Sequence, residues 1–238
     1  MNARALARRL LGDARLGALS FRKNPETRHS WGGPMNGQGW RCRLVAELML
    51  RLDLQAVVET GTFRGTTTEW LAAFQLPIFT CELSAEHFGF ARARLSNIPN
   101  VHLLHMDSRP ALRHLLNGPL GRYLDQDILF YLDAHWNNDL PLVEEIDLIF
   151  GKAKNAIVLV DDFQVPGDDG YSYDDYGGQK ALTREYIDES VRKHNLAAFG
   201  PITPSRRETG EKRGCIVLAR ELTRGPVLEQ MTLLRRLY

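Results

Sequence analysis

AVVETGTFRGTTTEWLAAF, residues 56–74, places a short apolar segment directly before a glycine-rich turn and a second segment of helical character. Residues 56–60 have the mainly apolar character of a strand buried on both faces of a parallel sheet. Gly61 and Gly65 allow the backbone to turn tightly and to come close to a ligand. A helix that begins here directs its unpaired backbone N–H groups toward the same place. The stretch therefore predicts a strand, a ligand-binding turn and a helix.

Strand and helix alternate over the rest of the chain. Short apolar strands separated by helices are typical of a doubly wound, mostly parallel α/β sheet with both faces covered. The last two strands lack an intervening helix, which predicts an antiparallel C-terminal hairpin. We expect seven strands, at 56–60, 78–83, 101–107, 127–134, 156–162, 197–202 and 214–220. We expect helices at 41–52, 65–74, 84–95, 109–116, 140–153 and 182–195.

The composition is that of a soluble globular protein. The chain has 238 residues, of which 44% are hydrophobic and 25% charged, with a formal net charge of +1. This length suits one α/β domain. The balanced charge argues against nucleic acid as a partner, and no apolar stretch approaches the roughly 20 residues needed to span a bilayer.

The segment before residue 41 differs from the rest. Residues 1–19 are rich in Arg and Leu and predict an amphipathic helix, with a transit peptide as the alternative. Residues 20–40 carry Gly, Pro and Asn and are predicted to be irregular. We therefore divide the chain into an N-terminal helix and irregular segment, 1–40, that covers a substrate, and a main domain, 41–238. Three scattered cysteines favour reduced thiols and a cytoplasmic location.

Polar residues end the first three predicted strands. Glu59 and Thr60 precede the glycine turn, Glu82 ends the second strand, and Asp107 and Ser108 follow the third. Ligands of such sheets bind outside the carboxyl ends of the strands, where a carboxylate can accept hydrogen bonds from ribose hydroxyls. Each residue also has a plain structural alternative, because the loop can be a turn, Glu82 a solvated strand end, and Asp107 a helix cap.

The loop lacks the G-x-G-x-x-G pattern of dinucleotide-binding proteins. It resembles instead the E/D-x-G-x-x-x-G loop of class I S-adenosylmethionine-dependent methyltransferases, and the resemblance covers roughly residues 41–220. It implies a Rossmann-like fold, S-adenosylmethionine as the cofactor, and an adenine contact at Asp107. The cofactor-binding residues that it implies are Glu59, Thr60, Gly61, Arg64, Gly65, Thr66, Glu82, Asp107, Ser108 and Asp133.

Three further carboxylates follow the fourth and fifth strands. Asp133 ends the fourth strand, and Asp161 and Asp162 end the fifth. Because these strands should be neighbours, like charges would gather there unless something positive lay between them. A hard divalent cation such as Mg²⁺ suits oxygen ligands of this kind. The alternative is that Asp133 caps a helix while Asp161 and Asp162 begin a solvated loop.

This arrangement resembles the metal-dependent O-methyltransferases of the catechol and macrolide-sugar type, which bind a cation through Asp residues at these two strand ends. The resemblance implies Asp133, Asp161 and Asp162 as metal ligands, with Asp133 also catalytic. Catechol-type enzymes place a Lys shortly after the first Asp, where this chain has Trp136. His135 is therefore the candidate general base, because its unperturbed pKa near 6.5 suits proton removal at neutral pH. The alternative is a hydrogen bond from His135 to a nearby loop.

Residues 164–180 contain four Asp, three Tyr and four Gly. They predict either a mobile lid or a polar loop without a direct role. As a lid, the loop would offer Tyr171, Tyr173 and Tyr176 to the substrate, and Trp136 would lie beside them.

Taken together, these features predict a metal-assisted O-methyltransferase that acts on a small-molecule hydroxyl in a sugar, diol or catechol-like compound. A metal-independent methyltransferase, a nicotinamide-dependent oxidoreductase and a non-catalytic binding module remain the alternatives. The sequence leaves a homo-oligomer open.

Overall fold

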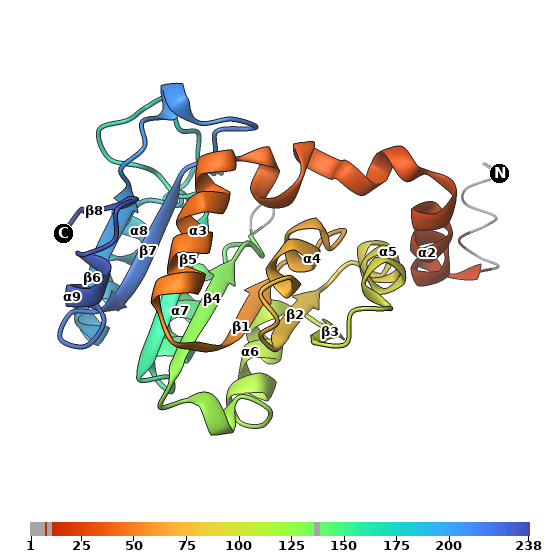
Figure 1. The fold of residues 1–238 in the computed structure, drawn as a ribbon, viewed down its shortest axis with the longest axis horizontal. Helices are drawn as coiled ribbons and strands as arrows, with labels where there is room; N and C mark the ends of the chain where they lie inside the picture. The colour runs from red at the N-terminus through yellow and green to blue at the C-terminus, as the bar shows by residue number, and fades with distance from the viewer. Residues whose placement is uncertain (1–7, 9–10, 136–138) are drawn as a thin grey trace.

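The computed structural model describes residue 8, residues 11–135 and residues 139–238. Within them the strands form one sheet in the order β3-β2-β1-β4-β5-β7-β6-β8 (Figure 1). The pairs among β1 to β5 are parallel, whereas β7 and β8 join the sheet antiparallel to their neighbours. The strands are β1 (Leu54–Thr60), β2 (Ile78–Glu82), β3 (Val101–His105), β4 (Asp127–Leu132), β5 (Asn155–Asp161), β6 (Leu196–Pro201), β7 (Cys215–Arg220) and β8 (Leu234–Arg236).

Helices cover both faces of the sheet, as the apolar strands require. One buried cluster joins the sheet to α6, α7 and α8, and a second joins the opposite face to α3, α4 and α9. The doubly wound α/β prediction is confirmed. The helices are α2 (Asp13–Lys23), α3 (Gly39–Arg51), α4 (Thr66–Ala72), α5 (Ala85–Leu95), α6 (Ser108–Leu116), α7 (Leu142–Phe150), α8 (Arg184–His194) and α9 (Gly225–Leu228), with 3₁₀ turns at Pro25–Gly32, Pro34–Gly37, Gly121–Tyr123 and Ser205–Arg207.

The predicted number of strands was one too few. The antiparallel pairing of β6 with β7 is confirmed, but β8 adds an eighth strand beside β6. It spans only three residues, Leu234–Arg236. Two of them are arginines, so neither its length nor its composition gives the alternation by which a strand is recognised.

The parallel register brings the carboxyl ends of β1, β4 and β5 together. Thr60 pairs with Leu132, and Leu132 pairs with Val160. The residues that follow these positions therefore leave the same edge of the sheet side by side. This edge is where ligands of doubly wound sheets bind.

The N-terminal segment runs from α2 beside α5, past α4, to α3. Figure 1 shows this course in red and orange, with α2 packed on α5. Gly17 and Gly89 allow the close contact of α2 with α5, because a Cβ on either would lie within 2 Å of a backbone oxygen of the other helix. Farther on, the Met35 N–H donates to Thr67 Oγ1 (3.0 Å) in the first turn of α4.

Among the described residues, no helix is both long enough and apolar enough to cross a membrane.

Candidate functional site at the carboxyl edge of the sheet

The glycine turn after β1 touches the end of β4. Gly61 has a φ of 88°, and a Cβ built on it would lie 2.2 Å from the backbone oxygen of Asp133. Gly65, with a φ of 74°, caps the N-terminus of α4 against Leu95. Only glycine satisfies both the left-handed backbone and the contact at Gly61. The turn therefore fixes the position of Asp133 as well as its own shape.

Glu59 and Thr60 lie beneath this turn. Glu59 is 1% exposed, and its Oε2 accepts hydrogen bonds from Thr68 Oγ1 (2.5 Å) and Thr80 Oγ1 (2.6 Å). Burial raises the pKa of Glu59 to about 7. Thr60 is fully buried. Both residues support the turn from inside the protein.

Glu82 stands at the rim of the same edge, where it is 9% exposed. Its two carboxylate oxygens accept the backbone N–H groups of Phe63 and Ser84, each at 2.7 Å. Burial raises the pKa of Glu82 above its ordinary range. A carboxylate has about four lone-pair sites, so capacity remains for ligand hydroxyls.

Asp107 is a helix cap in the structure, which was the alternative to a cofactor contact for this residue. It caps α6 by accepting the Arg109 N–H (3.0 Å), and it also pairs with the Arg109 guanidinium (2.9 Å). The hydrogen bonds from Arg109 hold the pKa of Asp107 below its usual range. The next residue, Ser108, is buried. A contact from Asp107 to an adenine would share the carboxylate with Arg109.

Two other predicted cofactor residues are engaged with the protein. The Arg64 guanidinium lies over the rings of Phe63 (5.2 Å) and Phe90 (5.3 Å). Thr66 Oγ1 accepts a hydrogen bond from Arg94 (2.9 Å) at the start of α4.

Asp161 is not one of the clustered donors, although its charge acts on Asp133. It is fully buried and pairs with the Arg41 guanidinium of α3. It also accepts the Tyr131 hydroxyl (2.5 Å) and the Asp162 N–H (3.0 Å). The positive charge that Asp161 needs is therefore supplied by Arg41, 120 residues earlier in the chain. Sequence reasoning missed this pair because nothing in the helix around Arg41 indicates its partner.

The structure gathers a different set of three donors. Ligand atoms of Asp133, His135 and Asp162 all lie within 4.8 Å of one another. Nε2 of His135 is 3.9 Å from Asp133 Oδ1 and 3.5 Å from Asp162 Oδ2. Of the three predicted metal ligands, two are brought together, and a histidine takes the place of Asp161.

Two residues that sequence reasoning missed complete this cluster. Arg213, just before β7, donates from Nε to Asp162 Oδ1 (2.5 Å) and from Nη2 to Asp174 Oδ1. Asp174 belongs to the loop 164–180, and its Oδ2 lies 3.8 Å from His135 Nε2. The loop therefore reaches the cluster through an aspartate. The loop has four Asp residues, and nothing in the sequence distinguishes Asp174 from the other three.

The imidazole of His135 is buried without a partner for one nitrogen. Its side chain is 3% exposed, and Nε2 has no hydrogen-bond partner among the described residues. Burial opposes protonation, but the carboxylates of Asp162 and Asp174 outweigh it and raise the pKa of His135. Burial and the neighbouring carboxylates raise the pKa of Asp133 well above its usual range. The cluster thus concentrates negative charge around one nitrogen.

A further buried carboxyl, Glu145 of α7, also lies close enough to interact with His135 and Asp107. It is 2% exposed, and burial raises its pKa to about 6. The sequence signal for it was weak, because an acidic residue in the first turn of a helix is ordinary.

The loop tyrosines take different positions. Tyr171 is buried, and its hydroxyl donates to the Thr203 carbonyl (2.9 Å). Tyr176 donates to Asp174 Oδ2 and so touches the cluster, whereas Tyr173 is half-buried. Trp136 lies outside the described residues.

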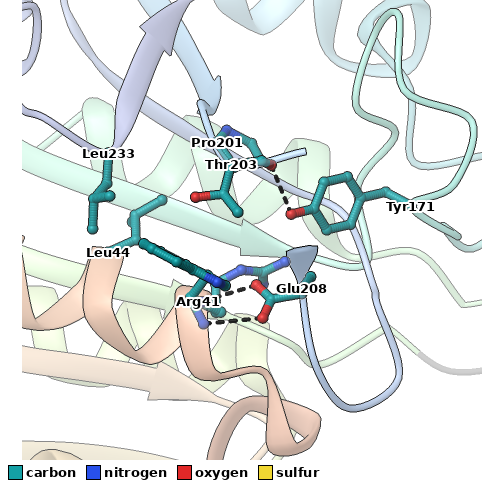
Figure 2. Close-up of a pocket in the computed structure, with 8 residues that line it drawn as sticks. Arg41, Leu44, Tyr171, Pro201, Thr203, Glu208 and Leu233 are labelled. Carbon is teal, nitrogen blue, oxygen red and sulfur yellow. Dashed lines mark hydrogen bonds between the residues drawn. The ribbon is translucent and has the colours of Figure 1, made fainter. Parts of the chain in front are cut away.

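Figure 2 shows a small cavity near Arg41 and Tyr171, and none of Asp133, His135 and Asp162 lines it. Its volume is about 10 Å³, enough for one water molecule at most. Beside it, Glu208 accepts the N–H groups of Trp40 (2.9 Å) and Arg41 (3.1 Å) at the start of α3. This region anchors α3, and so Arg41, to the sheet.

No protein-family model matches the sequence, and no curated protein matches it either. Solved structures are similar in fold. An O-methyltransferase from Bacillus cereus in complex with SAH is 16% identical, with a TM-score of 0.52 over 91% of this chain and 96% of that chain. Cofactor-bound Rv0187 from MTB is 19% identical, with a TM-score of 0.50 over 91% and 94% of the two chains. SAM-bound CalS10, an amino pentose methyltransferase from Micromonospora echinaspora involved in calicheamicin biosynthesis, is 18% identical, with a TM-score of 0.50 over 78% and 93%. The chain therefore has the fold of these proteins.

Proposed function

We propose that this protein is an S-adenosylmethionine-dependent O-methyltransferase that acts on a small-molecule hydroxyl with the help of a divalent cation. The contact between Gly61 and Asp133 carries the proposal, because it joins a cofactor-type glycine turn to the donor cluster at one sheet edge. The fold supports it, since two of the similar structures are methyltransferases with SAH or SAM bound.

The residues present fit S-adenosylmethionine. Gly61 lets the turn pack directly against the Asp133 carbonyl, and the helix α4 begins immediately beyond the turn. Two backbone N–H groups hold the Glu82 carboxylate in place, with acceptor capacity for the ribose hydroxyls. The turn and Glu82 are the parts of the chain that we expect to hold this cofactor.

The residues present also fit a divalent cation. Asp133, His135 and Asp162 offer three donor atoms within 4.8 Å of one another, and Nε2 of His135 is buried with no hydrogen-bond partner among the residues that the structure describes. A buried polar atom without a partner costs about 1–3 kcal/mol, which a bound cation would recover. We assign the cation to these three residues, while Asp161 stays with Arg41.

Each part of the site has a separate chemical task. When bound, S-adenosylmethionine supplies a methyl group that is already activated, and the cation lowers the pKa of the attacking hydroxyl. The chain's own task is to hold donor and acceptor about 3 Å apart and aligned, which contributes about 7–11 kcal/mol. Asp133 has two carboxylate oxygens, so one can bind the cation while the other accepts the proton, and it is our candidate for that role.

His135 cannot both bind a cation and accept a proton through Nε2. A metal-independent methyltransferase of the same fold is therefore a second candidate, in which His135 is the general base. Two observations favour it: Arg213 already neutralises part of the cluster, and the carboxylates raise the pKa of His135. Sensitivity of activity to a chelator separates the two candidates.

The acceptor class follows from the cation. Two adjacent oxygens can chelate one ion, so we propose a vicinal diol, sugar or catechol-like acceptor. Of the predicted substrate residues, Tyr176 touches the cluster and Tyr171 is turned toward Thr203. We also propose that residues 1–40 cover the substrate, since the Met35 N–H binds the first turn of α4. The three free cysteines support our prediction of a cytoplasmic location.

Calorimetry with S-adenosylhomocysteine, the demethylated cofactor, tests the proposal. We expect saturable binding, and we expect Asp133→Ala to abolish methyl transfer to diol acceptors while leaving most of the cofactor affinity intact. Equal loss of both would refute the division of roles between the turn and the cluster. Absence of binding in the wild-type protein would refute the methyltransferase assignment and favour an oxidoreductase or a binding module.

A further inference from the structure

We infer that the cluster takes a first-row transition-metal dication, from Mn²⁺ to Zn²⁺, in preference to Mg²⁺, and that Asp174 of the loop 164–180 completes its charge. This inference rests on the metal-assisted form of the proposed function. Its observations are the identity of the donors, the position of Arg213 and the unpartnered nitrogen of His135.

The distances from His135 to Asp133 and Asp162 suit donors around a shared ion. Nε2 lies 3.9, 3.5 and 3.8 Å from single carboxylate oxygens of Asp133, Asp162 and Asp174. None of these contacts gives Nε2 a well-formed hydrogen bond among the described residues. Two donors that each lie about 2.1 Å from one ion are about 3.0–4.2 Å apart. Asp174 stands outside the three-residue group, so we assign it an outer position.

Arg213 orients two of these carboxylates. Its guanidinium binds Oδ1 of Asp162 and Oδ1 of Asp174, which leaves both Oδ2 atoms facing His135. The loop carbonyls and amides reinforce this arrangement, because the Asp174 N–H donates to the Asp162 carbonyl (3.0 Å). Arg213 thus acts as a positioning residue that holds the loop against the end of β5.

The net charge of the residues around His135 is equal and opposite to that of a dication. Three carboxylates contribute −3 and Arg213 contributes +1, which leaves −2 with a neutral imidazole. Asp161 and Arg41 cancel each other and stay out of the sum. Without Asp174 the balance would be −1, so the loop supplies the second charge that the ion needs.

The imidazole decides which dication is preferred. Mg²⁺ favours carboxylate, carbonyl and water oxygens, whereas imidazole nitrogen suits the later first-row metals. Affinity also rises along that row from Mn²⁺. Mn²⁺ also accepts oxygen ligands, so it suits a set of two carboxylates and one buried imidazole, and it should bind this set more tightly than Mg²⁺.

Direct binding to the wild-type protein is the first measurement. Bound Mn²⁺ is counted by the loss of its free electron paramagnetic resonance signal, and Mg²⁺ is then titrated as a competitor. We expect one Mn²⁺ per chain, displaced only by Mg²⁺ in at least about tenfold excess. Displacement by an equal concentration of Mg²⁺, or absence of Mn²⁺ binding, overturns the inference.

A matched pair of loop variants tests Asp174. Asp174→Asn and Asp175→Asn remove the same charge from adjacent positions, but Asp175 is exposed and accepts the Gly177 N–H instead of facing His135. We expect Asp174→Asn to weaken Mn²⁺ binding about 10–100-fold, as for other outer partners of metal sites. Asp175→Asn should match the wild type. Equal affinities for both variants overturn the assignment of Asp174.

His135→Asn tests the selectivity itself. An amide oxygen replaces the imidazole nitrogen, so we expect the preference for Mn²⁺ over Mg²⁺ to disappear. An unchanged preference would contradict the role of the imidazole. Calorimetry with S-adenosylhomocysteine on the same samples separates this inference from the proposed function. Cofactor binding without Mn²⁺ binding refutes the metal inference alone, and Mn²⁺ binding without cofactor binding refutes the proposed function alone.

Discussion

Replacing Gly61 with alanine tests the contact that joins the glycine turn to the donor cluster. The new Cβ would lie 2.2 Å from the Asp133 backbone oxygen, where ordinary contacts begin at 3.4 Å, so one strand end must move by roughly 1 Å. A left-handed backbone costs alanine about 1–2 kcal/mol, and overpacking adds about 1–3 kcal/mol. We expect Gly61→Ala to lower the free energy of unfolding by about 2–5 kcal/mol.

Gly167→Ala provides the matched control. Gly167 has a φ of +80°, close to that of Gly61, but a Cβ there would meet no atom of the described residues within 4 Å. It should therefore cost only the backbone term of about 1–2 kcal/mol. Urea unfolding gives both values, and calorimetry with S-adenosylhomocysteine should show lost affinity for Gly61→Ala alone. Equal destabilisation by the two variants, with cofactor affinity retained in both, would refute the reasoning.

Three other predictions concern stability and cofactor binding. Arg41→Ala should lower the free energy of unfolding, measured in urea, by about 3–5 kcal/mol, because it leaves Asp161 buried and unpaired. The control Arg51→Ala, at a half-exposed ion pair, should cost under about 1 kcal/mol. Similar losses for the two variants would contradict this reasoning. Because burial raises the pKa of Glu59 from 4.5 to about 7, its stabilising contribution is complete below pH 4.5 and is lost as the pH rises through 7. Glu59→Gln should remove about 3 kcal/mol of that decline between pH 4.5 and pH 8, and an unchanged pH profile of unfolding would contradict the assignment. Glu82→Ala should weaken S-adenosylhomocysteine binding about tenfold or more by calorimetry, since hydrogen bonds to charged groups contribute about 1.5–3 kcal/mol, and full affinity would exclude Glu82 from the site.

The metal-ligand prediction shows how far strand-end reasoning reaches. The order of strands placed Asp133 and Asp162 at one edge correctly, because parallel strands end together. The same reasoning could not separate Asp161, which ends β5, from Asp162, which follows it with a φ of 54°. Arg41 decides the matter, since its guanidinium binds Asp161 from α3. That contact joins segments with no sequence relationship to each other.

Sequence reasoning favoured a metal ion as the source of positive charge among the carboxylates. In the structure, Arg41 neutralises Asp161, and Arg213 lies between Asp162 and Asp174. Both arginines are remote in sequence from the carboxylates that they bind. Asp133, Asp162, Asp174 and Arg213 still carry a net charge of −2. The electrostatic argument for a cation therefore applies to these residues, without Asp161.

The sequence by itself determined the architecture. Apolar strands, intervening helices and a glycine turn are local patterns whose periodicity is set by backbone geometry, so the chain from residue 54 to residue 220 could be laid out correctly. Only the tertiary structure decided which side chains share the site. The meeting of His135 with Asp174, and the loss of Asp161 to Arg41, depend on how loops and helices pack on the finished sheet. Contacts of that kind arise from long-range burial and charge pairing, which no local pattern records.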